Sequence, residues 1–199
     1  SAVVHGGFAY DRGTLKARLC VEGNRMMEQL SKELGFRFER CGKVLVGNTT
    51  EDMETLKRTL RQGEDNGAAG LELIDEARLH ELVPAVLGKF AMFSPNSGIL
   101  DPFNYTIGLA ENACANGVDY YLDHEVIGIC RRADGVYRLD TPKGEFYTRW
   151  VVNSAGLGCG KISDMLGIKG YQVIGSKGDY IILDKRTGPL LPMPVYPVP

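Results

Sequence analysis

The sequence predicts a mixed α+β fold in which helices interleave with mostly antiparallel strands. Amphipathic helical patterns alternate with short apolar runs that are rich in β-branched residues. The order of these elements lacks the regular βαβ repeat of a doubly wound parallel sheet. Many of the 25 glycines stand at the boundaries between the expected elements. These observations favour two interwoven layers over a single parallel sheet.

Four helices are expected in the first 117 residues, at 14–34, from Thr49 or Thr50 to 66, at 75–83 and at 101–117. Asp101 and Pro102 are a strong helix start, because proline is pre-organised for the first helical position. Gly35 ends the first helical run, and Gly117 stands where a left-handed C-cap is expected. The first and last of these helices each show a 3.6-residue apolar period. The residues expected to be buried are Leu15, Leu19, Met26, Met27, Leu30 and Leu34 in the first helix and Phe103, Ile107, Ala110 and Ala113 or Cys114 in the last.

Strands are expected around 44–46 and 71–74, and over 90–100 with a turn inside. Four further extended stretches follow at 118–122, 125–132, 136–141 and 145–153. Turns are expected at Asp134-Gly135 and at Lys143-Gly144. A short helix that ends near Gly167 and a last strand pair at 171–184 complete the pattern. The proline-rich end, 189–199, is expected to form no regular element. Together with the start without Met, it indicates a piece of a longer protein.

Composition and charge exclude several classes of function. The formal net charge of −2 gives no basic field for nucleic acid or an anionic membrane surface. No apolar run approaches the roughly 20 residues of a membrane-spanning helix, and the first residues lack a signal-peptide pattern. The five cysteines form no CxxC pair, which favours reduced thiols in a cytosolic protein. His5, His80 and His124 lie too far apart in sequence for a metal motif, so no metal is expected.

The segment WVVNSAGLGCGKI, residues 150–162, is the most suggestive local feature. An apolar strand runs into a glycine-rich turn that opens a helix, and such turns let a phosphate approach backbone N–H groups. Lys161 stands where a G-x-G-x-x-G fingerprint needs glycine, and Ala155 and Ile162 depart from a P-loop. A phosphate contact and a plain strand-to-helix connection therefore stay equally open.

Two other segments carry candidate side chains. His5 precedes Gly6 and Gly7, so its imidazole can project while the backbone packs against a flat ligand; a surface loop histidine is the alternative. Lys177 can hold an anionic substrate at a strand bend, or be a solvated turn lysine. Tyr180 can face a pocket or the core.

Six segments, in the same order, resemble FAD-dependent oxidoreductases of the D-amino-acid-oxidase superfamily. The similarity is strongest to the branch of glycerol-3-phosphate dehydrogenase and L-2-hydroxyglutarate dehydrogenase. The matching segments are SAVVHGGFAYDRGTLKARLCVEGNRMMEQL (1–30), RCGKVLVG (40–47), SGILDPFNYTIGLAENACANGV (97–118), HEVIGI (124–129), VVNSAGLGCGKISDMLG (151–167) and KGDYIILDK (177–185). They span essentially the whole chain.

The resemblance implies roles for individual residues. His5, Gly6 and Gly7 would lie near the isoalloxazine ring, the Val126 backbone near the adenine, and Ser154, Ala155 and Gly156 near the phosphate and ribose. His5 would also be the catalytic base or a polarising donor. Lys177 and Tyr180 would line the substrate pocket, although Lys177 stands where many relatives have Arg, which argues against a bidentate clamp. The stretches around His5, Val126 and Gly156 should then converge on one flavin slot.

The resemblance also implies a domain organisation and an activity. Residues 1–35 and 101–167 would form a partial FAD-binding domain, interwoven with a substrate-binding domain of residues 36–100 and 168–199 on a mostly antiparallel sheet. The reaction would be oxidation of a secondary alcohol beside an anionic group, with glycerol 3-phosphate preferred. L-2-hydroxyglutarate or another 2-hydroxy acid, an amine substrate, and a cofactor-free binding module are the alternatives.

The resemblance finally implies that the chain is an internal fragment. The G-x-G-x-x-G turn of the family and its C-terminal section are absent from the sequence. We therefore expect the 199 residues alone to be inactive and to bind FAD weakly or not at all. The parent protein would be cytoplasmic or peripheral to the membrane, and its electron acceptor and oligomeric state stay open.

Overall fold

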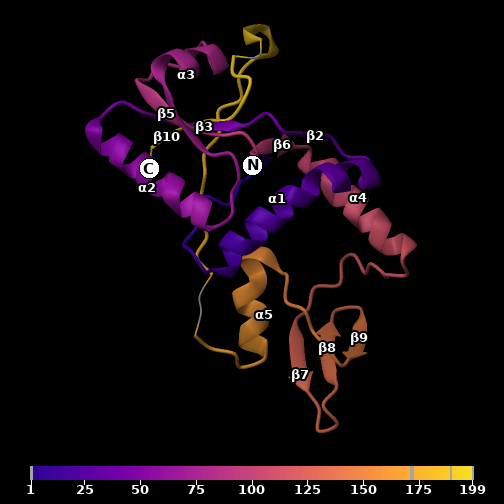
Figure 1. The fold of residues 1–199 in the computed structure, drawn as a ribbon. Helices are drawn as coiled ribbons and strands as arrows, with labels where there is room; N and C mark the ends of the chain where they lie inside the picture. The colour runs from indigo at the N-terminus through magenta and orange to yellow at the C-terminus, as the bar shows by residue number, and fades with distance from the viewer. Residues whose placement is uncertain (1, 171–172, 189, 199) are drawn as a thin grey trace. The chain divides into compact units, whose positions relative to one another are not determined.

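The computed structural model describes residues 2–170, 173–188 and 190–198. The chain divides into two compact units. Figure 1 labels the helices and strands of both. Unit 1 comprises Ser1–Val118 with Leu183–Pro199, and unit 2 comprises Asp119–Ile182. The predicted mixed fold with mostly antiparallel sheets is confirmed. The predicted division into cofactor and substrate domains concerns function, and it stays a prediction.

Unit 1 contains the four expected helices, each with the capping residues that the sequence indicated. They are α1 (Leu15–Leu34), α2 (Thr50–Asp65), α3 (Glu76–Leu82) and α4 (Pro102–Ala115). The Thr49 hydroxyl accepts from the Asp52 amide while the Asp52 carboxylate accepts from Thr49, which makes a capping box at the start of α2. The Asp101 side chain caps α4 by accepting from the amides of Phe103 and Asn104, with Pro102 in the first turn. Gly35, with φ of 71°, ends α1.

The main sheet of unit 1 has the strand order β10-β3-β5-β4. Its strands are β3 (Lys43–Gly47), β5 (Phe90–Ser94), β4 (Glu72–Asp75) and β10 (Val195–Pro197). The pairs are antiparallel except for β10, which runs parallel to β3. A second sheet joins β1 (Val3–Val4), β6 (Gly98–Leu100) and β2 (Phe38–Glu39). The expectation of no regular element near the C-terminus was wrong, because prolines are tolerated in an edge strand and β10 is one.

The core of unit 1 lies on both faces of β3. Val44 and Val46 point to one face, where they pack with Leu79 of α3. Leu45 points to the other face and packs with Leu56 of α2 and with Phe8. Both faces are covered by helices (Figure 1), which explains why β3 reads as a continuous apolar run.

The apolar faces expected for two helices were correct only in part: Met27, Leu30 and Leu34 of α1 and Ala110 and Ala113 of α4 are half-buried, but other predicted residues are exposed. The residues of α1 that are buried are Ala17, Val21 and Asn24, whereas Leu15, Leu19 and Met26 are exposed. In α4 the buried residue is Gly108, and Phe103 and Ile107 are exposed. A Cβ at Gly108 would lie 2.8 Å from the Leu34 carbonyl oxygen of α1. Gly108 thus lets α4 approach Leu34 of α1 closely, and a pattern of large apolar residues does not reveal such a contact.

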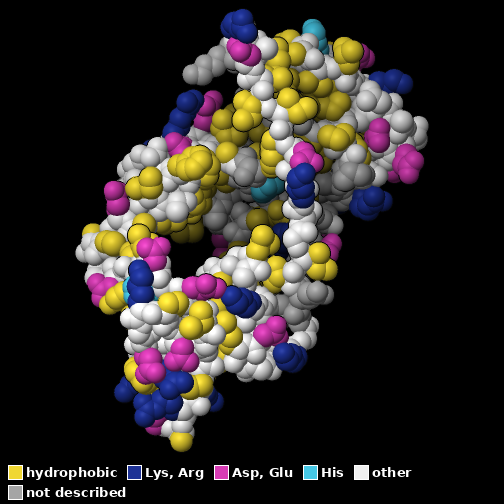
Figure 2. All heavy atoms as spheres, turned by 180° about the vertical axis from the view of Figure 1, so that it is seen from behind, with side chains coloured by type: hydrophobic (Ala, Val, Ile, Leu, Met, Phe, Trp, Pro, Cys, Tyr) yellow, Lys and Arg dark blue, Asp and Glu magenta, His cyan; other side chains and the backbone are white. Residues whose placement is uncertain are grey.

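Unit 2 is a meander followed by a short helix. Strands β7 (Gly128–Arg131), β8 (Tyr137–Thr141) and β9 (Gly144–Thr148) form an antiparallel sheet, with the expected turns between them. A 3₁₀ turn, η1 (Gly156–Gly158), leads into α5 (Cys159–Met165), which packs against β7. Figure 2 shows Lys, Arg, Asp and Glu side chains gathered at the β7–β8 end, where Arg132 pairs with Asp134.

Two strand predictions in the second half of the chain were wrong. Residues 118–122 form no strand, and neither do the described residues from 173 to 184. Ile181 and Ile182 in the latter stretch are more than 90% exposed. A strand needs a neighbour for its backbone N–H and C=O groups, and these apolar residues find none among the described residues. A 3₁₀ turn, η2 (Lys185–Thr187), follows in unit 1.

No helix within the described ranges is both long and apolar enough to cross a membrane.

Candidate functional site

His5 lies at the start of a loop that joins β1 to α1. Its side chain is half-buried, and the next three residues, Gly6, Gly7 and Phe8, are buried. Gly7 has φ of 82°, and a Cβ there would lie 2.4 Å from Cγ2 of Val21 on α1. Only glycine therefore fits at position 7, since the position is both left-handed and in contact with α1. The loop is thus packed tightly beneath a partly exposed histidine.

The surroundings of His5 favour its neutral form. Burial lowers the pKa of the imidazole below its ordinary value, and the positive charges of Lys43 and Lys16 lower it further. The Lys16 Nζ lies 4.4 Å from the ring centroid of Tyr10, and that ring lies 6.4 Å from the imidazole, centroid to centroid. A neutral imidazole can accept a proton, so His5 has the chemistry of a general base near neutral pH.

Lys43 is a buried cation beside this loop. It is the first residue of β3 and only 6% exposed. Its Nζ lies 4.7 Å from the ring centroid of Phe8 and 4.6 Å from that of Tyr196. Among the described residues, the ammonium thus has aromatic rings beside it rather than a carboxylate. Burial lowers the pKa of Lys43, and its positive charge has no counter-ion among the residues that the structure describes.

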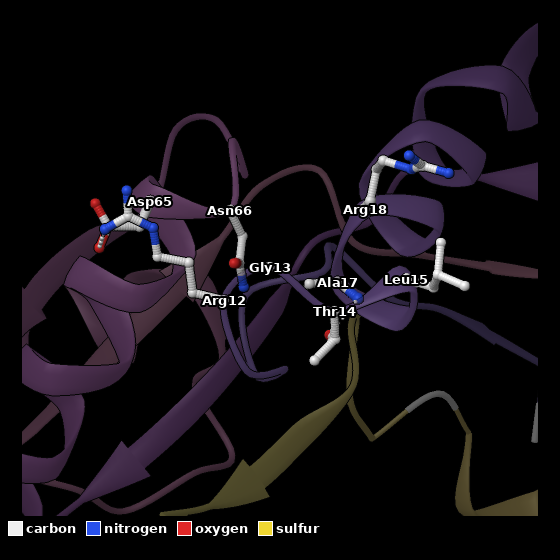
Figure 3. Close-up of a pocket in the computed structure, with 8 residues that line it drawn as sticks. All are labelled: Arg12, Gly13, Thr14, Leu15, Ala17, Arg18, Asp65 and Asn66. Atoms are coloured by element: carbon white, nitrogen blue, oxygen red, sulfur yellow. Dashed lines mark hydrogen bonds and ion pairs between the residues drawn. The ribbon is translucent and has the colours of Figure 1, made fainter.

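A cavity of about 340 Å³ lies where the same loop enters α1 (Figure 3). It is lined by Arg12, Gly13, Thr14, Leu15, Ala17, Arg18, Asp65 and Asn66. Its charged groups are already paired, Arg12 with Asp65 at 3.3 Å and Arg18 with Glu22 at 3.7 Å. These pairs leave little net charge for an ionic ligand, so this cavity is not the candidate site.

The glycine-rich turn of unit 2 is open. Ser154, Ala155 and Gly156 are exposed, and Gly156 has φ of 56°. A Cβ at Gly156 or at Gly160 would meet no atom within 4 Å. The Asn153 side chain links the two ends of the turn, because its Nδ2 donates to the Cys159 carbonyl oxygen at 2.9 Å. The turn therefore presents bare backbone to its surroundings.

The remaining predicted residues lie elsewhere in unit 2. Val126 is half-buried just before β7, and the next amide, of Ile127, donates to the Asp140 carbonyl oxygen. Lys177 is exposed and pairs with Asp179 at 2.8 Å. Tyr180 is 78% exposed. Val126 and the 154–156 turn thus share one unit while His5 lies in the other, and their convergence on one slot stays a prediction.

No group of three or more His, Cys, Asp or Glu side chains suited to a metal ion occurs in the part of the chain that the structure describes.

Comparison with known proteins decides the family. A family model described as FAD dependent oxidoreductase matches residues 1–199. The chain belongs to this family. Glycerol 3-phosphate dehydrogenase of Caloramator mitchellensis is 35% identical over 201 residues, which cover 100% of this chain and 42% of that protein. The mitochondrial L-2-hydroxyglutarate dehydrogenase of Mus musculus is 31% identical over 100% of this chain and 46% of its own length.

Solved structures show the same fold. L-α-glycerophosphate oxidase from Mycoplasma pneumoniae, with FAD bound, matches with a TM-score of 0.84 at 19% identity, over 100% of this chain and 54% of that one. L-proline dehydrogenase from P. horikoshii matches with a TM-score of 0.76 at 25% identity, over 84% of this chain and 44% of that one. The chain therefore spans about half, or less, of the length of these relatives.

The glycine-rich turn of unit 2 fits the FAD of this family. The space beside Gly156 and Gly160 is open, so the backbone there can be approached by a phosphate or a ribose. Gly6 and Gly7 are buried, and a Cβ at either would meet Ser94 or Val21 inside unit 1. That Gly6 and Gly7 of unit 1 and Val126 and Ser154–Gly156 of unit 2 together hold FAD stays a prediction.

Sequence reasoning missed Lys43 and the amide side chains around the His5 loop. A lysine that opens the apolar run KVLVG is a visible anomaly, and it could have indicated a buried charge. Asn24 lies seven positions after Ala17 and three after Val21, on the buried face of α1. Asn24 in line with these buried residues was the available signal. To use it, one had to know which face of α1 is buried.

Proposed function

We propose that the protein carrying this chain oxidises a secondary alcohol that stands beside an anionic group, with glycerol 3-phosphate as the preferred substrate. The observation that carries the proposal is the half-buried His5, with its lowered pKa, beside the buried ammonium of Lys43. A proton acceptor and an uncompensated positive charge are the two groups that such a substrate needs. The 35% identity to a glycerol 3-phosphate dehydrogenase supports the choice of substrate.

In this proposal the chain's own residues handle the proton and the anion. The neutral imidazole of His5 takes the hydroxyl proton as the C–H bond of the carbinol breaks. FAD, when bound, supplies the two-electron acceptor for the departing hydride. The positive charges of Lys43 and Lys16 attract the phosphate, and they disfavour a second positive charge on His5. The aromatic rings of Phe8 and Tyr196 shield Lys43 from water, which strengthens its field.

A second candidate is L-2-hydroxyglutarate. Several L-2-hydroxyglutarate dehydrogenases match the whole chain, at 31% identity for the mouse protein and 28% for that of Escherichia coli K12. This substrate also joins a secondary alcohol to a carboxylate, so the same two groups of the site would serve it. An amine substrate is less favoured, because two lysines near His5 repel an ammonium group.

The test is an assay of the full-length protein that contains this sequence. Purified protein is given a dye acceptor and, separately, glycerol 3-phosphate, L-2-hydroxyglutarate and glycine. We expect turnover of glycerol 3-phosphate with the highest kcat/KM, and a loss of about 10²-fold or more in His5→Asn. A protein without flavin absorbance would instead support a cofactor-free binding module. Preference for glycine would contradict the proposal.

A further inference from the structure

The loop that carries His5 is bound by side chains rather than by other backbone groups. Four carbonyl oxygens in residues 5–10 accept hydrogen bonds from side-chain amides. The bonds are Asn24 Nδ2 to His5 O at 3.1 Å, Asn66 Nδ2 to Gly7 O at 3.1 Å and to Tyr10 O at 2.7 Å, and Gln62 Nε2 to Phe8 O at 3.3 Å. Buried carbonyl groups need such partners. Three amides thus hold the path of a loop that pairs with no strand through backbone hydrogen bonds among the described residues.

Arg40 determines the orientation of the Asn24 amide. Arginine has only donors, and Nη1 of Arg40 donates to Oδ1 of Asn24 at 3.1 Å. The Asn24 oxygen therefore faces Arg40, and its Nδ2 is directed to the carbonyl oxygens of His5 and Asn96. Arg40 also donates to the Asn96 carbonyl oxygen at 2.9 Å, which closes the network. Asn24 is only 5% exposed, so water does not compete strongly for these bonds.

Asn66 and Gln62 hold the other end of the loop from α2. Asn66 is the C-cap of α2, and its side chain reaches the loop, as the view in Figure 3 shows. Between its two acceptors lies Phe8, which is 2% exposed. A Cβ at Gly63 of α2 would lie 2.7 Å from the Phe8 Cβ, so α2 approaches the loop closely. The loop is therefore fixed between α1 and α2 by apolar contact and by amides together.

We propose that Asn24, Gln62 and Asn66, with Arg40 behind Asn24, are positioning residues that set the location of the His5 imidazole. None of the four carbonyl bonds involves the imidazole, so the ring stays available while its backbone is fixed. A catalytic group must be held within about 0.5 Å of its productive position, and a loop alone rarely achieves this. The inference rests on the proposed role of His5 in alcohol oxidation.

The experiment compares Asn66→Ala with Asn116→Ala in the flavin-loaded full-length protein. Asn116 also donates its amide to a carbonyl oxygen, that of Asn112 at 2.8 Å, but at the end of α4 and away from the loop. We expect Asn66→Ala to lower kcat by roughly 10- to 100-fold. We expect its KM for glycerol 3-phosphate to change much less, because Lys43 is untouched. Asn116→Ala should match the wild type in both parameters.

Amide hydrogen exchange provides a readout that does not depend on turnover. In Asn66→Ala, peptides covering residues 3–12 should exchange faster, while peptides from β3 and β5 should not change. Asn24→Ala should show the same pattern. If Asn66→Ala does not fold, Gln62→Ala removes only the bond to Phe8 and gives the same test.

The outcomes separate the inference from the proposed function. If the loop exchanges at the wild-type rate in the folded variants, the inference that these amides position His5 is overturned. Faster exchange with an unchanged kcat would overturn it too. A wild-type protein that turns over none of the three substrates rejects the proposed function instead, whatever the exchange of the loop shows.

Discussion

The loop at His5 in unit 1 and the glycine turn at Gly156 in unit 2 are packed in opposite ways. The His5 loop is buried, held by three side-chain amides and shaped by a glycine that cannot be replaced without a clash. The turn at Gly156 is exposed and left open, with nothing within 4 Å of an added Cβ. Each has a left-handed glycine, but for different reasons.

The difference teaches what each segment is built to do. A proton acceptor works best if its position is fixed before the substrate arrives, and the way the chain holds the His5 loop agrees with the role proposed for His5. A phosphate or ribose contact needs only accessible N–H groups, and the partner can complete the packing when it binds.

Adding a methyl group at the two glycines gives the largest expected difference. Gly7→Ala combines a left-handed φ with a Cβ 2.4 Å from Val21 Cγ2, and should cost about 3 kcal/mol of unfolding free energy. Gly156→Ala adds only the left-handed strain and should cost about 1 kcal/mol. Urea denaturation of each variant measures the costs. Equal costs at the two positions would mean that the loop and the turn do not differ in packing.

Replacing the buried cation should separate binding from stability. Lys43→Met removes a positive charge that has aromatic rings beside it, so stability should stay constant or rise. The KM for glycerol 3-phosphate should rise roughly tenfold, because the phosphate loses a nearby charge. The matched control is Lys57→Met, since Lys57 is an exposed lysine of α2 paired with Glu54 at 2.8 Å. A marked loss of stability in Lys43→Met with an unchanged KM would assign Lys43 to packing alone.

The pH dependence should follow His5. Its pKa in the folded protein is lowered from the ordinary value of 6.5, first by burial and then by Lys43 and Lys16. The unfolded chain therefore takes up this proton first as the pH falls. The corresponding stability is present above about pH 6.5 and is lost as the pH falls toward the folded pKa.

Activity should fall over the same acidic range, as the imidazole becomes protonated. Urea titrations and kcat/KM profiles between pH 5 and pH 8 check both effects, and His5→Asn should flatten the stability difference. An acidic limb centred above pH 6.5 would contradict a lowered pKa.

The smallest effect is expected at a surface ion pair of unit 2. Lys161 and Glu125 lie 2.7 Å apart, with both side chains largely exposed. Water screens such pairs, so Glu125→Gln should leave the urea midpoint unchanged within error. A clear loss would show that unit 2 depends on its surface charges.

Local signals in the sequence were enough for the helix ends and most strands. Thr49 with Asp52, and Asp101 with Pro102, specify helix starts through bonds that reach only two or three residues. The side-chain amides that hold the His5 loop could not be found in this way, because Asn66 lies 59 positions from Gly7, whose carbonyl oxygen it binds. Contacts at such separation depend on how α1 and α2 pack, and no periodicity encodes that.

The candidate site was predicted only where glycine marks the backbone. Gly7 and Gly156 were noticed for their neighbours in sequence, and both have left-handed backbone. Lys43 was overlooked, because a single charge within an apolar strand is unexplained until Phe8 and Tyr196 are seen beside it. The most buried face of α1 was missed for a similar reason, since Ala17 and Val21 are small enough for Gly7 of the His5 loop to lie against them.

The most direct test of the account is a crystal structure of the full-length protein with FAD bound. We predict that the His5–Gly7 stretch lies beside the isoalloxazine ring and that Ser154–Gly156 lies against the phosphate and ribose of the same FAD molecule. A structure in which either stretch lies away from the cofactor would contradict the account.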